Sequence, residues 1–250
     1  MDKEVFGQSQ LTGFENKAPD YANVVNTVVL STVDLLNHKS ILYDSEHLKE
    51  KLTNLKIIRR DGVNHEYDGN SNSIFLSFCD QEGKLYDDEK MTITTIHELM
   101  HMISHPKEAD NFGDDYFGFN EFFTEYLTFL TVMKLGGINL ESYYKHEVKG
   151  YCGNNIDINI IKNLSNKAGF NKLLNCYINR DESALQELVG KETLEAMNDY
   201  CGCIIDFAET TSWPIKKINE MLEKPLFAPQ KQAIDSFVGK INQGISTQRN

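Results

Sequence analysis

Hydrophobic residues in the first part of the chain follow two spacings, one helical and one extended. Residues 21–37 carry valine and leucine at helical intervals and predict a helix, and Ser45 can cap a shorter helix that ends near residue 55. Residues 56–60, which contain an Ile-Ile pair, and the apolar run 73–78 each lie next to turn residues, which predicts two strands. The second run has the clearest strand pattern in the chain.

Two longer helices are predicted next. Asp87 or Asp88 can cap the first, which continues to just before Pro106, because the residue before a proline disfavours the helical conformation. The second covers residues 120–135 and ends at a Gly-Gly pair, a common stop at helix C-termini.

The last hundred residues show short helical patterns and no internal repeat. Glycine or proline interrupts these patterns at Gly169, Gly190, Pro214, Pro225 and Pro229. The whole pattern predicts an α+β protein. Residues 1–20 form a flexible arm, residues 21–137 an α/β part with a small mixed sheet, and residues 138–250 a mostly helical part packed on it.

The charge balance limits the choice of partners. A net charge of −12 and a pI of about 5.0 disfavour nucleic acid or an anionic membrane surface as the main partner. No apolar stretch approaches the ~20 residues of a membrane span. The N-terminus lacks the basic-then-apolar order of a secretory signal, which predicts a cytoplasmic protein, or an exported one whose signal has been removed.

The cysteines form a sparse set of odd number, which favours buried free thiols over a disulfide framework. The five are Cys79, Cys152, Cys176, Cys201 and Cys203. The close pair Cys201-Gly-Cys203 does not favour a metal site, because residues two apart on a helix face different sides.

The residues best suited to metal binding and catalysis lie in the sequence IHELMHMISH, residues 96–105. On a helix, His97 and His101 are offset by about 40° and lie roughly 6 Å apart along the axis, so both imidazoles can reach one ion. Glu98 points about 100° away from His97 and stays outside the ligand set, where it can take a proton from a metal-activated water. The pattern HExxH is short enough to arise by chance, so a third ligand has to support it.

Glu121 is the candidate third ligand, because a catalytic zinc ion needs three protein ligands and one open position. Nineteen residues separate it from His101, and it begins a polar stripe with Thr124, Glu125 and Thr128, beside an aromatic face expected to be buried. The two carboxylates, four residues apart, repel each other mildly unless a positive group lies near them.

The sequence HExxH, separated by nineteen residues from the glutamate of Asn-Glu-Phe-Phe-Thr-Glu (residues 120–125), resembles the gluzincin metallopeptidases, the thermolysin-type branch of the zincins. The resemblance implies that His97, His101 and Glu121 bind one Zn²⁺ per chain and that Glu98 is the general base. It also implies that Glu125 orients the first histidine through a hydrogen bond.

The resemblance covers residues 73–128 and implies a zincin-like fold, in which an active-site helix packs on a small sheet. The strand 73–78 is then expected at the sheet edge, where an extended peptide or protein substrate lies. A segment with which some gluzincin aminopeptidases read a free amino terminus is absent, which favours an endopeptidase. Oligomeric state is left open.

Two other classes of protein remain. In one, the zinc site belongs to a binding or regulatory module without proteolysis. In the other, the motif is accidental in a helical structural protein. Metal content separates the accidental motif from the other two, and peptide cleavage separates the enzyme from the binding module.

Two residues compete with Glu121 as third ligand. His105 lies one turn beyond His101, but residues 102–104 contain no glycine turn that would bring its ring back to the ion. Cys79 could supply a thiolate, as in deformylase-like sites, but the residues that flank it do not resemble that family. His38, His47 and His65 have no partner at a suitable spacing and are expected at the surface.

The donor that stabilises the oxyanion of the reaction is left open by the sequence. Tyrosine, histidine or arginine from another part of the fold usually provides it. Four residues near the predicted ligands qualify: Tyr116, Tyr143, Tyr144 and His146.

Overall fold

The chain divides into two compact units. The first consists of Met1–Lys107 with Leu127–Val148, and the second of Glu108–Tyr126 with Lys149–Asn250, so that helix α4 (Phe117–Leu135) contributes to both. The structure is a computed structural model. It describes residues 10–12, 18–41, 43–60, 65–79, 83–104, 116–141, 143, 156–211, 222 and 224–247.

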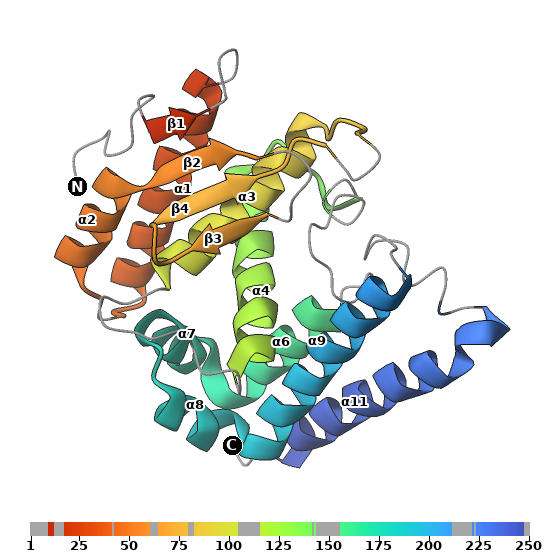
Figure 1. Ribbon diagram of the computed structural model, residues 1–250. Coiled ribbons are helices and arrows are strands. Elements are labelled where there is room, and N and C mark those ends of the chain that lie inside the picture. The colour runs from red at the N-terminus through yellow and green to blue at the C-terminus, as the bar shows by residue number, and fades with distance from the viewer. Residues whose placement is uncertain are drawn as a thin grey trace. The chain divides into compact units, whose positions relative to one another are not determined.

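The first unit contains a four-stranded mixed sheet with the order β1-β2-β4-β3 (Figure 1). Its strands are β1 (Leu11–Thr12), β2 (Lys56–Arg59), β3 (Glu66–Asp68) and β4 (Ser73–Leu76). Strand β2 runs parallel to both β1 and β4, and β3 is antiparallel to β4. The small mixed sheet is confirmed, but the expectation that the 73–78 strand forms its edge is wrong, because the short polar strand β3 pairs outside it.

Residues 10–12, inside the segment predicted as an arm, are attached to this sheet. Leu11 and Thr12 pair with Ile57 and Ile58 of β2. The side-chain amide of Gln10 also donates hydrogen bonds of 2.8 Å to the carbonyl oxygens of Leu52 and Leu55. A strand of two residues gives almost no pattern in a sequence, so only pairing reveals it.

Three helices complete this unit with the second half of α4: α1 (Ala18–His38), α2 (Ser45–Asn54) and α3 (Asp88–Ile103). All were predicted, although Asp44 rather than Ser45 caps α2. Helix α3 packs on β3, β4 and α1 (Figure 1). It is buried along its whole second half, from Ile93 to Ile103, which is typical of a helix inside a core.

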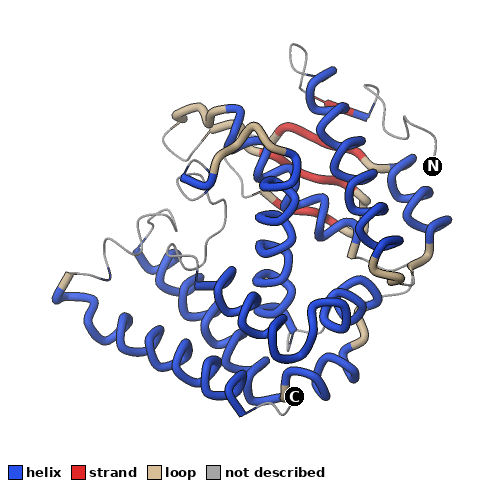
Figure 2. The backbone as a smooth tube through the Cα atoms, turned by 180° about the vertical axis from the view of Figure 1, so that it is seen from behind, coloured by secondary structure: helices blue, strands red, loops and turns tan. Residues whose placement is uncertain are grey.

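The described part of the second unit is helical throughout (Figure 2). Its helices after α4 are α6 (Ile156–Leu164), α7 (Phe170–Asn179), α8 (Glu182–Val189), α9 (Lys191–Thr211) and α11 (Ala228–Thr247). The predicted α+β class with a mostly helical C-terminal part is confirmed. The described helices include none with both the length and the apolar character that crossing a membrane requires.

The prediction of only short C-terminal helices is wrong, since α9 has 21 residues and α11 has 20. The prolines do not break α11. Pro225 begins a 3₁₀ turn just before it, and Pro229 is its second residue, where the missing N–H has no helical partner to lose. Gly190 precedes α9 in a left-handed conformation (φ 84°) and so separates it from α8.

Candidate metal centre

Helix α3, which carries HExxH, is fixed at its start by its own sequence. The Asp87 side chain accepts the N–H of Lys90 at 2.9 Å, and Asp88 and Glu89 place negative charge in the first turn, where the helix dipole favours it. The hydroxyls of Thr94 and Thr95 donate to carbonyl oxygens one turn earlier. The helix can therefore be buried without leaving these hydroxyls unsatisfied.

The structure brings the three predicted ligands together. His97, His101 and Glu121 are 1%, 9% and 7% exposed, and one donor atom from each lies within 4.8 Å of the other two. The Nε2 atoms of the two histidines are 3.1 Å apart, with the ring planes at 71°. Both imidazoles thus present the same nitrogen to one point.

This arrangement fits a metal ion. Two nitrogens 3.1 Å apart, each at the ~2.0–2.1 Å bonding distance of zinc, subtend roughly 95–100° at the ion, close to a tetrahedral angle. Two neutral imidazoles and a carboxylate are also the donors that several divalent metals accept. The cluster can therefore hold a metal ion, and its geometry does not name which one.

Glu121 lies on α4, one turn after a close contact with α9. The backbone N–H of Gly118 donates to Oδ1 of Asn198 at 2.7 Å, which supplies a cap for the start of α4. A Cβ atom at Gly118 would lie 2.4 Å from the backbone carbon of Met197, so only glycine allows this approach. The position of the third ligand thus depends on Asn198, which lies 80 positions after Gly118.

The polar stripe of α4 is buried as a whole. Glu121, Thr124, Glu125 and Thr128 are all less than a tenth exposed. The hydroxyl oxygens of Thr124 and Tyr177 are 2.6 Å apart, and the Tyr177 ring lies 5.0 Å from that of Phe123 on the neighbouring aromatic face. The aromatic side chains therefore exclude water from the stripe, which strengthens any electrostatic interaction there.

Two more polar groups share this environment. Cys201 and Asp157 are 0% and 2% exposed. Burial, then the negative charges of Glu121 and Asp157, raises the pKa of the Cys201 thiol well above its usual range. The Cys201 thiol is therefore neutral at physiological pH in these surroundings. Sequence reasoning missed Asp157, because no motif links it to Glu121.

Glu98 and Glu125 are both buried. Glu98 is 1% exposed with both carboxylate oxygens buried, and Glu125 is 2% exposed. Each lies next to the cluster in sequence, one directly after His97 and the other one turn after Glu121. Their roles as general base and as orienting carboxylate stay predictions.

The histidines set aside as surface residues differ from one another. His38 is exposed and His47 is half-buried. His65 is 8% exposed, so its predicted surface position is wrong. Its Nδ1 accepts the N–H of Ser77 at 3.1 Å, and its ring lies beside Tyr86. It is a packed core histidine, and the local sequence does not predict its hydrogen bond with the Ser77 backbone.

The structure describes some of the alternative ligands and of the candidate donors for the oxyanion, but not all of them. Cys79 is a half-buried free thiol. Tyr116 is half-buried, whereas Tyr143 is fully buried with its ring 5.4 Å from that of Phe129. The remaining predicted residues lie outside the described part of the chain: His105, Tyr144 and His146.

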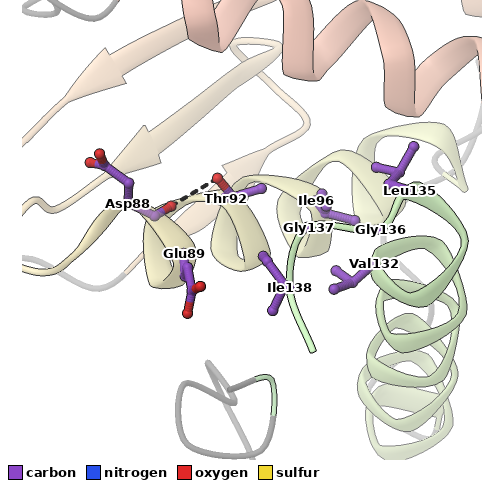
Figure 3. A pocket seen from close by; sticks show the side chains of 9 residues that line it. All are labelled: Asp88, Glu89, Thr92, Ile96, Val132, Leu135, Gly136, Gly137 and Ile138. Carbon is purple, nitrogen blue, oxygen red and sulfur yellow. Dashed lines mark hydrogen bonds between the residues drawn. The ribbon is translucent and has the colours of Figure 1, made fainter. Parts of the chain in front are cut away.

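A pocket of about 200 Å³ lies elsewhere on α3 (Figure 3). It is lined by Asp88, Glu89, Thr92 and Ile96 together with the end of α4 and the residues after it, to Ile138. Thr92 donates to the backbone oxygen of Asp88 at 2.8 Å within it. None of the clustered ligands lines this pocket, so it is not the metal centre.

No family model, no curated protein and no solved structure matches this chain. The residues of the site are therefore what supports a function for this protein.

Proposed function

We propose that this protein is a zinc-dependent metallopeptidase of the gluzincin type that hydrolyses peptide bonds, as an endopeptidase. The observation that carries the proposal is the buried cluster of His97, His101 and Glu121. Its three donors match the two imidazoles and one carboxylate of one common class of catalytic zinc site, which keeps a fourth position open.

Each side chain has a distinct task in this proposal. His97, His101 and Glu121 hold the metal, which when bound acts as a Lewis acid toward the peptide carbonyl and lowers the pKa of water toward ~7. Glu98 takes a proton from the attacking water and transfers it to the leaving amine as the carbon–nitrogen bond breaks. Glu125 holds the imidazole of His97 in orientation.

The edge strand β3 is where an extended substrate fits best. It is antiparallel to β4 at one edge of the described sheet, and α3 packs against both strands. A peptide added to this edge receives backbone hydrogen bonds that do not depend on its sequence, while side-chain pockets give selectivity. Such binding along the chain suits an endopeptidase.

The test combines metal analysis with cleavage of a peptide library. The purified protein is expected to contain one zinc ion per chain and to cleave internal bonds. Glu98→Gln should keep the fold and the zinc but lose cleavage by at least ~100-fold, because the proton acceptor is gone. Glu89→Gln, on the same helix but outside the cluster, is the matched control and should cleave normally.

Two results would redirect the proposal. A protein without zinc, and without affinity for it, would reject the metal site itself. Wild-type protein that binds zinc tightly but cleaves no peptide would favour the binding or regulatory module.

A further inference from the structure

Lys51, on the last turn of α2, is a buried cation close in space to the end of α3. Its side chain is 8% exposed, and its ammonium group donates a hydrogen bond of 2.8 Å to the carbonyl oxygen of Met102. A buried ammonium is costly unless polar partners compensate it. The position therefore needs a reason beyond filling space.

The end of α3 has carbonyl groups that require donors, since the last four of any helix lack helical partners. The backbone N–H of Ser104 donates to the carbonyl oxygen of Met100 at 3.0 Å, and the Ser104 hydroxyl donates to that of His101 at 3.1 Å. The ammonium group of Lys51, on a different helix, donates to the carbonyl oxygen of Met102. A positive charge is also favoured at this end by the helix dipole.

A closed set of contacts fixes the Lys51 side chain. Its ammonium lies 5.2 Å from the centre of the Tyr67 ring, on its face. The Tyr67 hydroxyl donates to Oδ1 of Asn72 at 3.0 Å, and the Asn72 amide donates to the backbone oxygen of Lys51 at 2.7 Å. Both ends of Lys51 are thus held, and its ammonium is pre-organised toward α3.

We propose that Lys51 is a positioning residue of the metal centre. Met102 directly follows His101, so the bond from Lys51 fixes the turn of α3 that carries this ligand. Holding the turn sets the direction of the His101 ring, whose Nε2 lies 3.1 Å from that of His97 and must stay near it for both to bind one ion. This inference rests on the proposed metal function and adds a residue that no spacing in the sequence indicates.

Lys51→Met is the direct test, because it keeps the apolar stem and removes the ammonium. Two readouts are measured: the rise in Tm on adding zinc, and the visible absorption of the Co²⁺-loaded protein. We expect zinc affinity to fall by about 10-fold, as for other groups that orient ligands, together with a changed Co²⁺ band. Lys49→Met, an exposed lysine on the same helix, should match wild type.

The readouts separate positioning from plain stability. A purely structural lysine would lower the Tm of the metal-free and zinc-loaded protein equally, leaving zinc affinity and the Co²⁺ spectrum unchanged, and that result would overturn the proposal. Lys51→Arg keeps a cationic donor and should recover most of the affinity. If Lys51→Met does not fold, Lys51→Gln, with a shorter neutral donor, is judged by the same two readouts.

Failure of the metal function itself looks different. In that case the wild-type protein shows no zinc-induced rise in Tm and no Co²⁺ band, so there is no affinity for any Lys51 variant to lose.

Discussion

Helices α3 and α4 carry the three clustered ligands, yet they begin in different ways. Helix α3 is capped by Asp87, whose side chain accepts an N–H three residues ahead. Helix α4 is capped at Gly118 by Asn198, 80 residues away. The first cap is visible in the sequence and the second exists only in the folded protein. A motif can therefore locate ligands without revealing what holds one of them.

Among the variants that test this comparison of α3 and α4, Gly118→Ala should cause the largest loss of stability. The new methyl group meets the Met197 backbone at 2.4 Å, which no side-chain rotation relieves, and should destabilise the protein by about 3 kcal/mol. Urea unfolding measures the loss. Gly202→Ala, inside α9 with nothing near its Cβ position, is the control and should be neutral or stabilising by up to ~1 kcal/mol. Equal results for both variants would contradict the close approach.

Glu125→Ala tests whether α4 contributes one carboxylate or two to the metal centre. If Glu125 orients His97, zinc affinity should fall by ~10–100-fold, measured by competition with a chelator. Glu141→Ala, at an exposed position, is the control. Unchanged affinity would remove Glu125 from the site.

The two caps themselves can be compared directly. Asn198→Ala leaves the part-buried N–H of Gly118 without its partner and should cost about 2 kcal/mol. Asp87→Ala removes an exposed cap and should cost about 1 kcal/mol, since water replaces part of the bond. Thermal unfolding of the metal-free variants gives both values. The reverse order would mean that the distant cap matters less than the local one.

The smallest effects concern the buried thiols near α4 and on α7. Burial raises the pKa of Cys176 to about 11 and that of Cys201 well above its usual value, so neither should react with a thiol reagent at pH 8 until the protein unfolds. Unfolding restores a pKa near 9. Stability should therefore fall as pH rises above ~9, because the unfolded chain then loses protons that the folded one keeps. Rapid labelling of both thiols in the native protein would contradict this burial.

Local signals predicted the elements that carry the site. The apolar run of β4, the Asp87 cap of α3 and the Gly136 end of α4 all depend on residues within a few positions. The lengths of α9 and α11 escaped prediction, although the breaks expected at Gly190 and Pro225 do fall just before these helices. Gly202 lies inside α9, and the packing of α9 on α11 outweighs the low helix propensity of this one glycine.

The site could be predicted only as far as its motif reached. The spacing of His97, His101 and Glu121 led to three residues that do lie together. Lys51 and Asn198 each form a hydrogen bond with a backbone group far away in the sequence. Every residue carries such backbone groups, so no sequence motif reveals these contacts. Burial of His65 is equally non-local, since it depends on a hydrogen bond with Ser77 on the other side of a strand pair.

The cap from Asn198 also has a consequence for the order of events on the ribosome. Glu121 is synthesised early, but the residue that fixes the start of its helix follows 77 positions later. At ~5–20 residues per second, the nascent chain grows for roughly 4–15 s before this support exists. Any metal ion that this cluster holds would therefore be bound by all three residues only after most of the chain has been made.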